Sequence, residues 1–253
     1  MRAWIGTSGW VYGDWRGRVY PKEVKDRDRL AWYATRFPTV EINASFYRLP
    51  PRETFDRWRT QTPPDFCFAV KMSRYVTHIR RLRETAEGLE LFWEAAAGLG
   101  AKRGPLLVQL PPTLRADIDL LDAFLDAMRP DARAAFEFRH SSWDTEDVRR
   151  RLAATGAAWV LADRPGAVVP LHVTAAWSYA RFHQGRRASA GYPRAKLRRW
   201  ADRLASMPVE ELFVYFNNDP GGAAVRDAST MTGMLSEAGV DVASTDQPAS
   251  SSP

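Results

Sequence analysis

Eight short apolar segments alternate along the chain with longer segments in which apolar residues recur every three or four positions. The apolar segments, each the length of a buried strand, are residues 3–6, 39–43, 67–71, 106–109, 134–138, 159–162, 180–183 and 213–216. The amphipathic segments, which have the period of a helix, are residues 28–37, 52–60, 84–100, 117–128, 145–155, 194–206 and 222–238. Strands that alternate with helices in this way predict an α/β protein with a (β/α)8 barrel of the TIM type. Residues 164–179, between the sixth and seventh strands, carry no clear helix, so we expect the barrel to be somewhat irregular there.

An open, doubly wound parallel sheet is the alternative fold. Such sheets usually carry a G-x-G-x-x-G fingerprint after the first strand, and the sequence GTSGWVYGDW at residues 6–15 does not match it. No linker divides the chain, and 45% of its 253 residues are hydrophobic, which is enough for one large core. We therefore expect a single domain over residues 1–240, followed by a polar tail at residues 241–253 that is predicted to be disordered.

Composition excludes several classes of protein. Cys67 is the only cysteine, so neither an intramolecular disulfide nor an all-cysteine metal cluster can form. The first residues lack the apolar segment of a signal peptide, and no stretch approaches the roughly 18 apolar residues of a membrane span. We therefore expect a cytoplasmic protein with no membrane partner. The net charge of +6 favours an anionic partner.

A carboxylate interrupts the second apolar segment, in the sequence TVEINASFYRLPP at residues 39–51. Glu41 and Asn43 lie two positions apart, and therefore on one face of a strand, among residues that favour burial. A buried carboxylate is costly unless it is paired or hydrogen-bonded. In a (β/α)8 barrel the carboxyl ends of the strands build the active site, so a functional role explains polar residues at this position.

The other predicted strands also end in ionisable or carboxamide side chains. Those expected at the carboxyl-terminal mouth of the barrel, and assigned to substrate binding or catalysis, are Lys71, Gln109, Glu137, Arg139, His140, Asp163, Arg181, His183, Asn217 and Asn218, with Asn43 and Tyr47 from the second strand. A structural ion pair explains any one of them; Glu41 with Arg139, for example, could be a buried pair. The coincidence of so many strand ends favours a functional pocket.

Two arginine-rich segments follow the third and seventh strands and belong to the same mouth. The first, SRYVTHIRRLRET at residues 73–85, supplies Arg74, His78 and Arg80. The second, QGRRASAGYPRAKLRRW at residues 184–200, supplies Arg186 and Arg187. Because the planar guanidinium fork matches phosphate and carboxylate groups, these segments predict a small anionic ligand.

Six motifs, in order along the chain, resemble the YecE-like proteins, domain of unknown function family 72. They are GTSGWVYGDWRGRVYP (6–21), VEINASFYRLP (40–50), FAVKMSRYVTH (68–78), LLVQLPP (106–112), FEFRHSSW (136–143) and YFNNDPGGAAVRDA (215–228). The resemblance spans residues 2–238 and implies a TIM barrel, in agreement with the strand count. It implies no reaction, because the function of the family is unassigned. The sequence departs from the motif at Ala44-Ser45, where Ser or Thr followed by Thr is more frequent.

These residues favour a cofactor-independent enzyme, a hydrolase or lyase, that acts on a small or terminal phosphate- or carboxylate-bearing ligand. Lys71 is the candidate electrophile or base: either burial lowers its pKa, or a neighbouring Glu41 or Glu137 keeps it charged. Glu41 or Glu137 is the candidate general acid or base. The carboxamides that would orient the substrate are those of Asn43, Gln109 and Asn217.

Two alternatives remain open. A hydrolase- or isomerase-like barrel could bind a divalent metal, and the hard ligands available for it are Glu41, Glu137, Asp163 and His183. Lys71 and Arg139 in the same pocket would repel that metal. A nucleic-acid-binding module could use the basic loops and their aromatic residues. The residues alone also leave open whether Glu41 and Lys71 are catalytic or belong to a structural ion-pair network.

Overall fold

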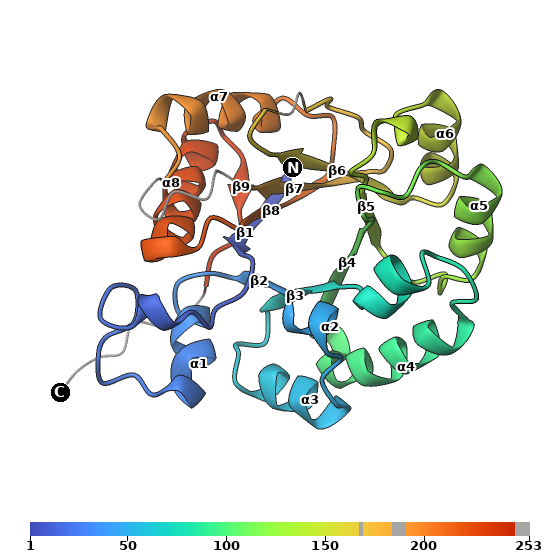
Figure 1. Ribbon diagram of the computed structural model, residues 1–253. Helices are drawn as coiled ribbons and strands as arrows, with labels where there is room; N and C mark the ends of the chain where they lie inside the picture. Colours follow the sequence, from blue (N-terminus) through green and yellow to red (C-terminus); the bar gives the residue numbers. More distant parts are fainter. Residues whose placement is uncertain (167–168, 184–190, 246–253) are drawn as a thin grey trace.

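Nine parallel strands form one curved sheet in the computed structural model, which describes residues 1–166, 169–183 and 191–245. In chain order the strands are β1 (Arg2–Thr7), β2 (Thr39–Ile42), β3 (Cys67–Lys71), β4 (Arg103–Gln109), β5 (Ala134–Glu137), β6 (Ala158–Asp163), β7 (Trp177–Phe182), β8 (Glu211–Phe216) and β9 (Asp241–Val242). Their spatial order is β2-β3-β4-β5-β6-β7-β8-β1-β9. The sheet curls, and helices lie around its outer side, as in proteins of the TIM-barrel type (Figure 1).

Apart from the short helix α2, the helices lie where the amphipathic pattern predicts them, mostly with slightly shorter bounds. They are α1 (Arg29–Ala34), α2 (Ala44–Tyr47), α3 (Arg52–Thr60), α4 (Ala86–Ala96), α5 (Ile118–Asp126), α6 (Glu146–Ala154), α7 (Arg194–Ala205) and α8 (Ala223–Glu237). Side-chain caps fix two of the starts. Asp117 accepts from the amide of Leu120 before α5, and Thr145 accepts from the amide of Val148 before α6.

The strands separate two layers of core, because side chains alternate between the two faces of a strand. One layer fills the space between the sheet and the helices. The other fills the inside of the curl with a cluster that includes Ala69, Leu107, Ala135 and Tyr179. Two residues further along the same strands come Lys71, Gln109, Glu137 and Arg181. The interior is therefore apolar below and polar at the carboxyl ends, as the sequence predicts.

The two sides of the curl approach each other at β1 and β2. Ser8 and Glu41 form an isolated parallel bridge, and the amide of Gly9 donates to the carbonyl of Glu41 at 2.8 Å. Lower down, the Tyr33 hydroxyl accepts from the amide of Thr7 at 2.9 Å and donates to the carbonyl of Thr39 at 3.1 Å. A side-chain hydroxyl thus stands between two strands where a ladder would place backbone hydrogen bonds.

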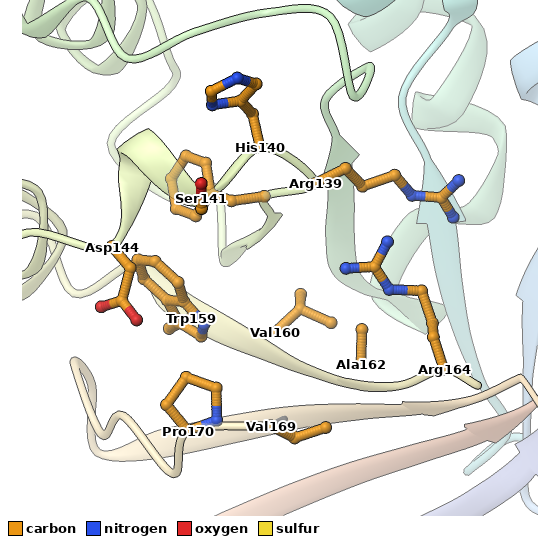
Figure 2. Close-up of a pocket in the computed structure, with 11 residues that line it drawn as sticks. Arg139, His140, Ser141, Asp144, Trp159, Val160, Ala162, Arg164, Val169 and Pro170 are labelled. Carbon is orange, nitrogen blue, oxygen red and sulfur yellow. The ribbon is translucent and has the colours of Figure 1, made fainter. Parts of the chain in front are cut away.

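β5 and β6 pair over a short distance and then separate. Their register covers only Ala135 with Ala158 and Phe136 with Trp159. A cavity of about 300 Å³ lies between the segment that follows β5 and the body of β6 (Figure 2). The connection from β6 to β7 contains no helix over its described residues, which confirms the irregularity expected there.

Four segments differ from the sequence prediction. Residues 44–47 turn into the short helix α2, and residues 75–79 form a short π-helix after β3. The helix expected at residues 84–100 ends at Ala96 and continues as a tighter 3-10 turn at Ala97–Lys102. We expected a disordered tail from residue 241 onwards, yet β9 pairs with β1 and the amide of Ala243 donates to the carbonyl of Ala3 at 2.8 Å. Among the described helices, none has the length and apolar character that a membrane crossing requires.

Candidate functional site

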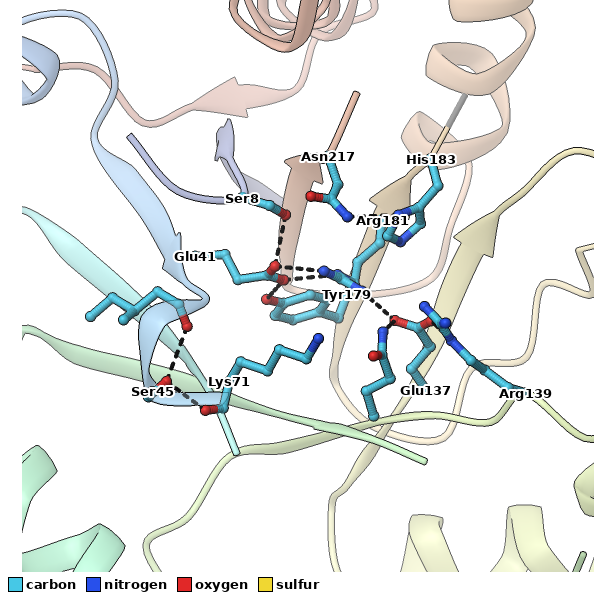
Figure 3. Close-up of polar contacts among 12 residues, drawn as sticks. Ser8, Glu41, Ser45, Lys71, Glu137, Arg139, Tyr179, Arg181, His183 and Asn217 are labelled. Carbon is cyan, nitrogen blue, oxygen red and sulfur yellow. Dashed lines mark hydrogen bonds and ion pairs between the residues drawn. The ribbon is translucent and has the colours of Figure 1, made fainter. Parts of the chain in front are cut away.

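The carboxyl ends of three strands converge on the guanidinium group of Arg181 in β7 (Figure 3). Its Nε and Nη2 donate to the two carboxylate oxygens of Glu41 at 2.9 and 2.7 Å, the bidentate geometry of a strong pair. Its Nη1 donates to Oε2 of Glu137 at 2.5 Å. Because Glu41 lies in β2 and Glu137 in β5, one side chain joins three strands across the mouth. All three side chains are at most 1% exposed.

Glu41 is the buried carboxylate that the sequence made conspicuous, and four donors satisfy it. Besides the two bonds from Arg181, the hydroxyls of Ser8 and Tyr179 donate to it, each at 2.7 Å. Burial alone would raise the pKa of Glu41, but the charge of Arg181 and these hydrogen bonds hold that pKa below its ordinary value. The pairing of Glu41 with Arg139 that we considered is wrong, because Arg181 takes that place.

Glu137 belongs to the same network. Its Oε1 accepts from Nε of Arg139 and its Oε2 from Nε2 of Gln109, both at 2.9 Å. Burial would raise the pKa of Glu137, but Arg181 and then Arg139 hold it well below the ordinary value. We expected Glu41 or Glu137 to act as the general acid or base. Both carboxylates are engaged by Arg181 in this structure, and their catalytic role stays a prediction.

Lys71, at the end of β3, extends toward this network without joining it (Figure 3). In the part of the chain that the structure describes, no carboxylate oxygen lies within 4.0 Å of its Nζ. The Nζ instead lies 4.0 Å from the centre of the Phe46 ring. Lys71 is 8% exposed, and burial, with the charge of Arg181 as the next cause, lowers its pKa to about 8. The sequence suggested two environments for Lys71, burial or a neighbouring glutamate. Lys71 is buried, and among the described residues it has no directly paired carboxylate.

A cavity of about 460 Å³ opens beside Lys71. Its polar lining consists of Lys71, Asn43, Asn217, Tyr12 and Asp219, and Trp10 and Trp58 are among its apolar walls. Tyr47 stands at its rim with 73% of its surface exposed. The loops after β1, β2 and β8 thus meet the end of β3 around one space. The structure brings together Lys71, Asn43, Tyr47 and Asn217 as predicted.

Asp219 is one of the site residues that sequence reasoning missed. It follows Asn218 directly in the motif YFNND, so the signal was present one residue beyond the predicted positions. Its Oδ1 is buried without a hydrogen-bond partner among the described residues. Burial, reinforced by the negative charge of Glu41, raises the pKa of Asp219 to about 7. Tyr12, which lines the same cavity, was missed as well; its hydroxyl donates to the carbonyl of Ser8.

His183 lies beside Arg181 and is held by Asn217. The Asn217 Nδ2 lies 2.9 Å from the His183 Nδ1, and since an amide nitrogen only donates, Nδ1 accepts and the ring proton is on Nε2. Burial and the charge of Arg181 lower the pKa of His183 to about 3, so the ring is neutral near pH 7. Its Nε2 is buried and has no hydrogen-bond partner in the described chain.

Several predicted residues lie outside the cavity beside Lys71. Asp163 pairs with Lys196 at 2.7 Å, and Asn218 donates to Asp227 at 2.7 Å, so both have structural partners. The Nδ1 of His140 accepts from the amide of Ser142 at 3.1 Å.

The loop after β3 is less available to an anion than its arginines suggested. Arg80 pairs with Glu84 at 2.7 Å, and Arg83 pairs with Asp117 at 3.3 Å. Arg74 is exposed. His78 packs edge-on against the Phe46 ring, and burial together with the charge of Lys71 lowers its pKa to about 4. Arg186 and Arg187, the other predicted anion-binding residues, lie outside the described residues.

The metal alternative relied on Glu41, Glu137, Asp163 and His183. These side chains are held in separate contacts: the two glutamates by Arg181, Asp163 by Lys196, and His183 by Asn217. Over residues 1–166, 169–183 and 191–245, no three His, Cys, Asp or Glu side chains are grouped as metal ligands. Metal and nucleic-acid binding by this chain both stay predictions.

A curled parallel sheet, helices on its outer side and a cavity at the carboxyl ends of its strands define a TIM-barrel-like α/β protein. The chain belongs to the family described as "Protein of unknown function DUF72", whose sequence model matches residues 4–252. The resemblance noted in the sequence is thereby confirmed.

Named relatives and solved structures agree with this family. The chain is 27% identical to the UPF0759 protein YunF of Bacillus subtilis, over 92% of this chain and 94% of YunF. It is 30% identical to the UPF0759 protein YecE of Escherichia coli K12, over 53% of this chain and 52% of YecE. A crystal structure of a DUF72 family protein from Thermotoga maritima superposes with a TM-score of 0.83 at 28% identity, over 93% of this chain and all of that chain.

Proposed function

We propose that this protein is a cofactor-independent enzyme, a hydrolase or lyase, that acts on a small ligand carrying a phosphate or carboxylate group. The observation that carries the proposal is the Lys71 ammonium group. It is buried beside a cavity of about 460 Å³ and has no carboxylate partner within 4.0 Å among the described residues. A buried charge without a partner is costly unless a ligand supplies the counter-charge.

The proposed chemistry is acid–base catalysis by Lys71 and Asp219. The pKa of Lys71 is lowered to about 8 and that of Asp219 is raised to about 7, mainly by burial in both cases. Near neutral pH each group can therefore give or take a proton, which is the property a general acid or base needs. Asn43 and Asn217 would orient the polar part of the ligand, and Trp10 would cover its apolar part.

Glu41, Glu137 and Arg181 form the rigid structural framework of this proposed site. Two carboxylates and one guanidinium, fully buried and mutually bonded, hold the field around Lys71 constant while a ligand reacts. We also infer that the strands close into a complete (β/α)8 barrel. The bridge between Ser8 and Glu41 and the hydroxyl of Tyr33 between β1 and β2 support that inference.

A panel of small esters tests the proposed function. Wild-type protein is incubated with p-nitrophenyl phosphate, p-nitrophenyl acetate and small phosphate and carboxylate esters, and acid release is measured. Lys71→Met and Asp219→Asn should each lower turnover by about 100-fold or more, since a general acid or base typically contributes that factor. Lys25→Met is the matched control, because Lys25 is exposed and does not line the cavity. Wild-type turnover in Lys71→Met would remove this lysine from the mechanism.

A further inference from the structure

The separation of β5 from β6 makes a second cavity at the same end of the sheet. The neighbouring pairs stay together up to Gln109 with Glu137 and up to Asp163 with Phe182. β5 and β6 pair only as far as Phe136 with Trp159. The cavity of about 300 Å³ between them is lined by residues after β5, including Arg139 and His140, by residues of β6, and by Arg164, which follows β6.

Two guanidinium groups face this cavity, and Figure 2 shows them on the same side of it. Arg139 uses its Nε to donate to Glu137, and its two terminal nitrogens make no hydrogen bond within the described chain. Arg164 makes neither a hydrogen bond nor an ion pair with any described residue, and its Nε is buried. Like charges repel, and a buried donor without an acceptor is destabilising. Among the described residues, no hydrogen-bond acceptor lies between the guanidinium groups of Arg139 and Arg164.

The charges around the cavity indicate the sign and the amount of charge that a bound ligand would have to supply. Glu41 and Glu137 balance Arg181 and Arg139. Asp144, the acidic residue in the cavity wall, is already engaged by Arg149 at 2.6 Å and His172 at 2.8 Å. This leaves Arg164 and Lys71 as two positive charges with no carboxylate oxygen within 4.0 Å among the described residues; Asp219 shares the cavity of Lys71, but its pKa of about 7 leaves it only partly ionised near neutral pH. A group with two negative charges would balance them.

We propose that the gap between β5 and β6 is an anion seat, in which Arg139 and Arg164 hold the phosphate group of the ligand whose reacting part lies at Lys71. This assignment rests on the proposed function and adds the class of substrate, a small phosphate-bearing molecule. The guanidinium fork donates two parallel hydrogen bonds to a phosphate, and the terminal nitrogens of both arginines are available for it. Arg139 connects the seat to the buried network through Glu137.

Binding of inorganic phosphate tests the seat without knowledge of the reaction. Phosphate affinity is measured by calorimetry for wild type, Arg164→Gln, Lys71→Met and Arg150→Gln. Arg150 is the matched control, because it is exposed on α6 and, within the described part of the chain, pairs only with Asp147. Removing one charge-assisted contact of about 1.5–3 kcal/mol should weaken phosphate binding about 10- to 100-fold in Arg164→Gln. The control should bind as wild type does.

A chemical probe gives a second measurement that does not depend on a variant. Phenylglyoxal modifies accessible arginines, and phosphate should protect Arg164 and Arg139 but not Arg150, as read by mass spectrometry. Unchanged phosphate affinity in Arg164→Gln, or absence of phosphate binding to wild type, would overturn the seat. If phosphate binding is lost only in Lys71→Met, the seat is wrong and the proposed function stands. Tighter binding of acetate than of phosphate would overturn the assignment of a doubly charged group.

Discussion

Lys71 and Asp219 line one cavity, and their pKa values are displaced toward each other, to about 8 and about 7. The same physical cause acts on both, because burial disfavours the charged form of an amine and of a carboxyl group alike. For Lys71, a pKa lowered by burial could be predicted from the sequence, because Lys71 ends a predicted strand. The shift could not be predicted for Asp219, because the burial of a residue three positions beyond the end of β8 depends on how the following loop packs.

The displaced pKa of Lys71 can be measured before any substrate is known. Only the neutral amine reacts with acetic anhydride, so trace labelling at a series of pH values reports the titration of each lysine. Because burial favours the neutral form, labelling of Lys71 should reach half its maximum at a pH of about 8. Exposed Lys22 and Lys25 provide internal references within the same digest. Identical pH profiles for Lys71 and these references would contradict the buried setting described here.

At the scale of elements, the end of β2 shows where sequence reasoning reached its limit. The predicted strand ended at Asn43 and no helix was predicted after it, but Asn43 has helical backbone angles and α2 begins at Ala44. The turn places Phe46 over the ammonium group of Lys71 and leaves Tyr47 exposed at the rim. That a buried carboxylate in β2 needs a partner was predictable. That the partner is Arg181 of β7 was not, because a long side chain reaches across the curl.

The contacts of Arg181 tie β2, β5 and β7 together, and a double-mutant cycle tests this role. Arg181→Met leaves Glu41 and Glu137 with less compensation for their burial, so we expect unfolding free energy to fall by about 3–5 kcal/mol. Glu41→Gln combined with Arg181→Met should cost less than the sum of the single changes, because the two groups no longer need each other. Urea denaturation measures both.

The matched control for this cycle is the exposed pair of Arg129 and Asp131, at 3.2 Å, where the same kind of cycle should give less than about 1 kcal/mol of coupling. Equal coupling in the buried and the exposed pair would show that Arg181 does not hold the three strands.

At the scale of the whole molecule, the fold was predictable because the alternation of strand and helix repeats along the whole chain. Because the pattern of strand and helix repeats, small errors in where a predicted strand ends do not change the order of the strands. β9 was missed because two residues, Asp241 and Val242, carry no readable period. The contact between β1 and β2 was equally invisible, because a bridge at Ser8 and a hydroxyl from Tyr33 leave no pattern in sequence.

Gly6 allows that contact to be tested. A Cβ atom at Gly6 would lie 2.2 Å from the carbonyl oxygen of Thr39 and 3.0 Å from the Tyr33 hydroxyl, so Gly6→Ala must push β1 and β2 apart. We expect the unfolding free energy to fall by about 1–3 kcal/mol, as for overpacking in a core. Gly233→Ala is the matched control, because nothing lies within 4 Å of its added Cβ in α8 and alanine favours helix by about 1 kcal/mol. A Gly6→Ala variant as stable as wild type in urea would mean that β1 and β2 do not meet, and that the curled sheet is open at this side.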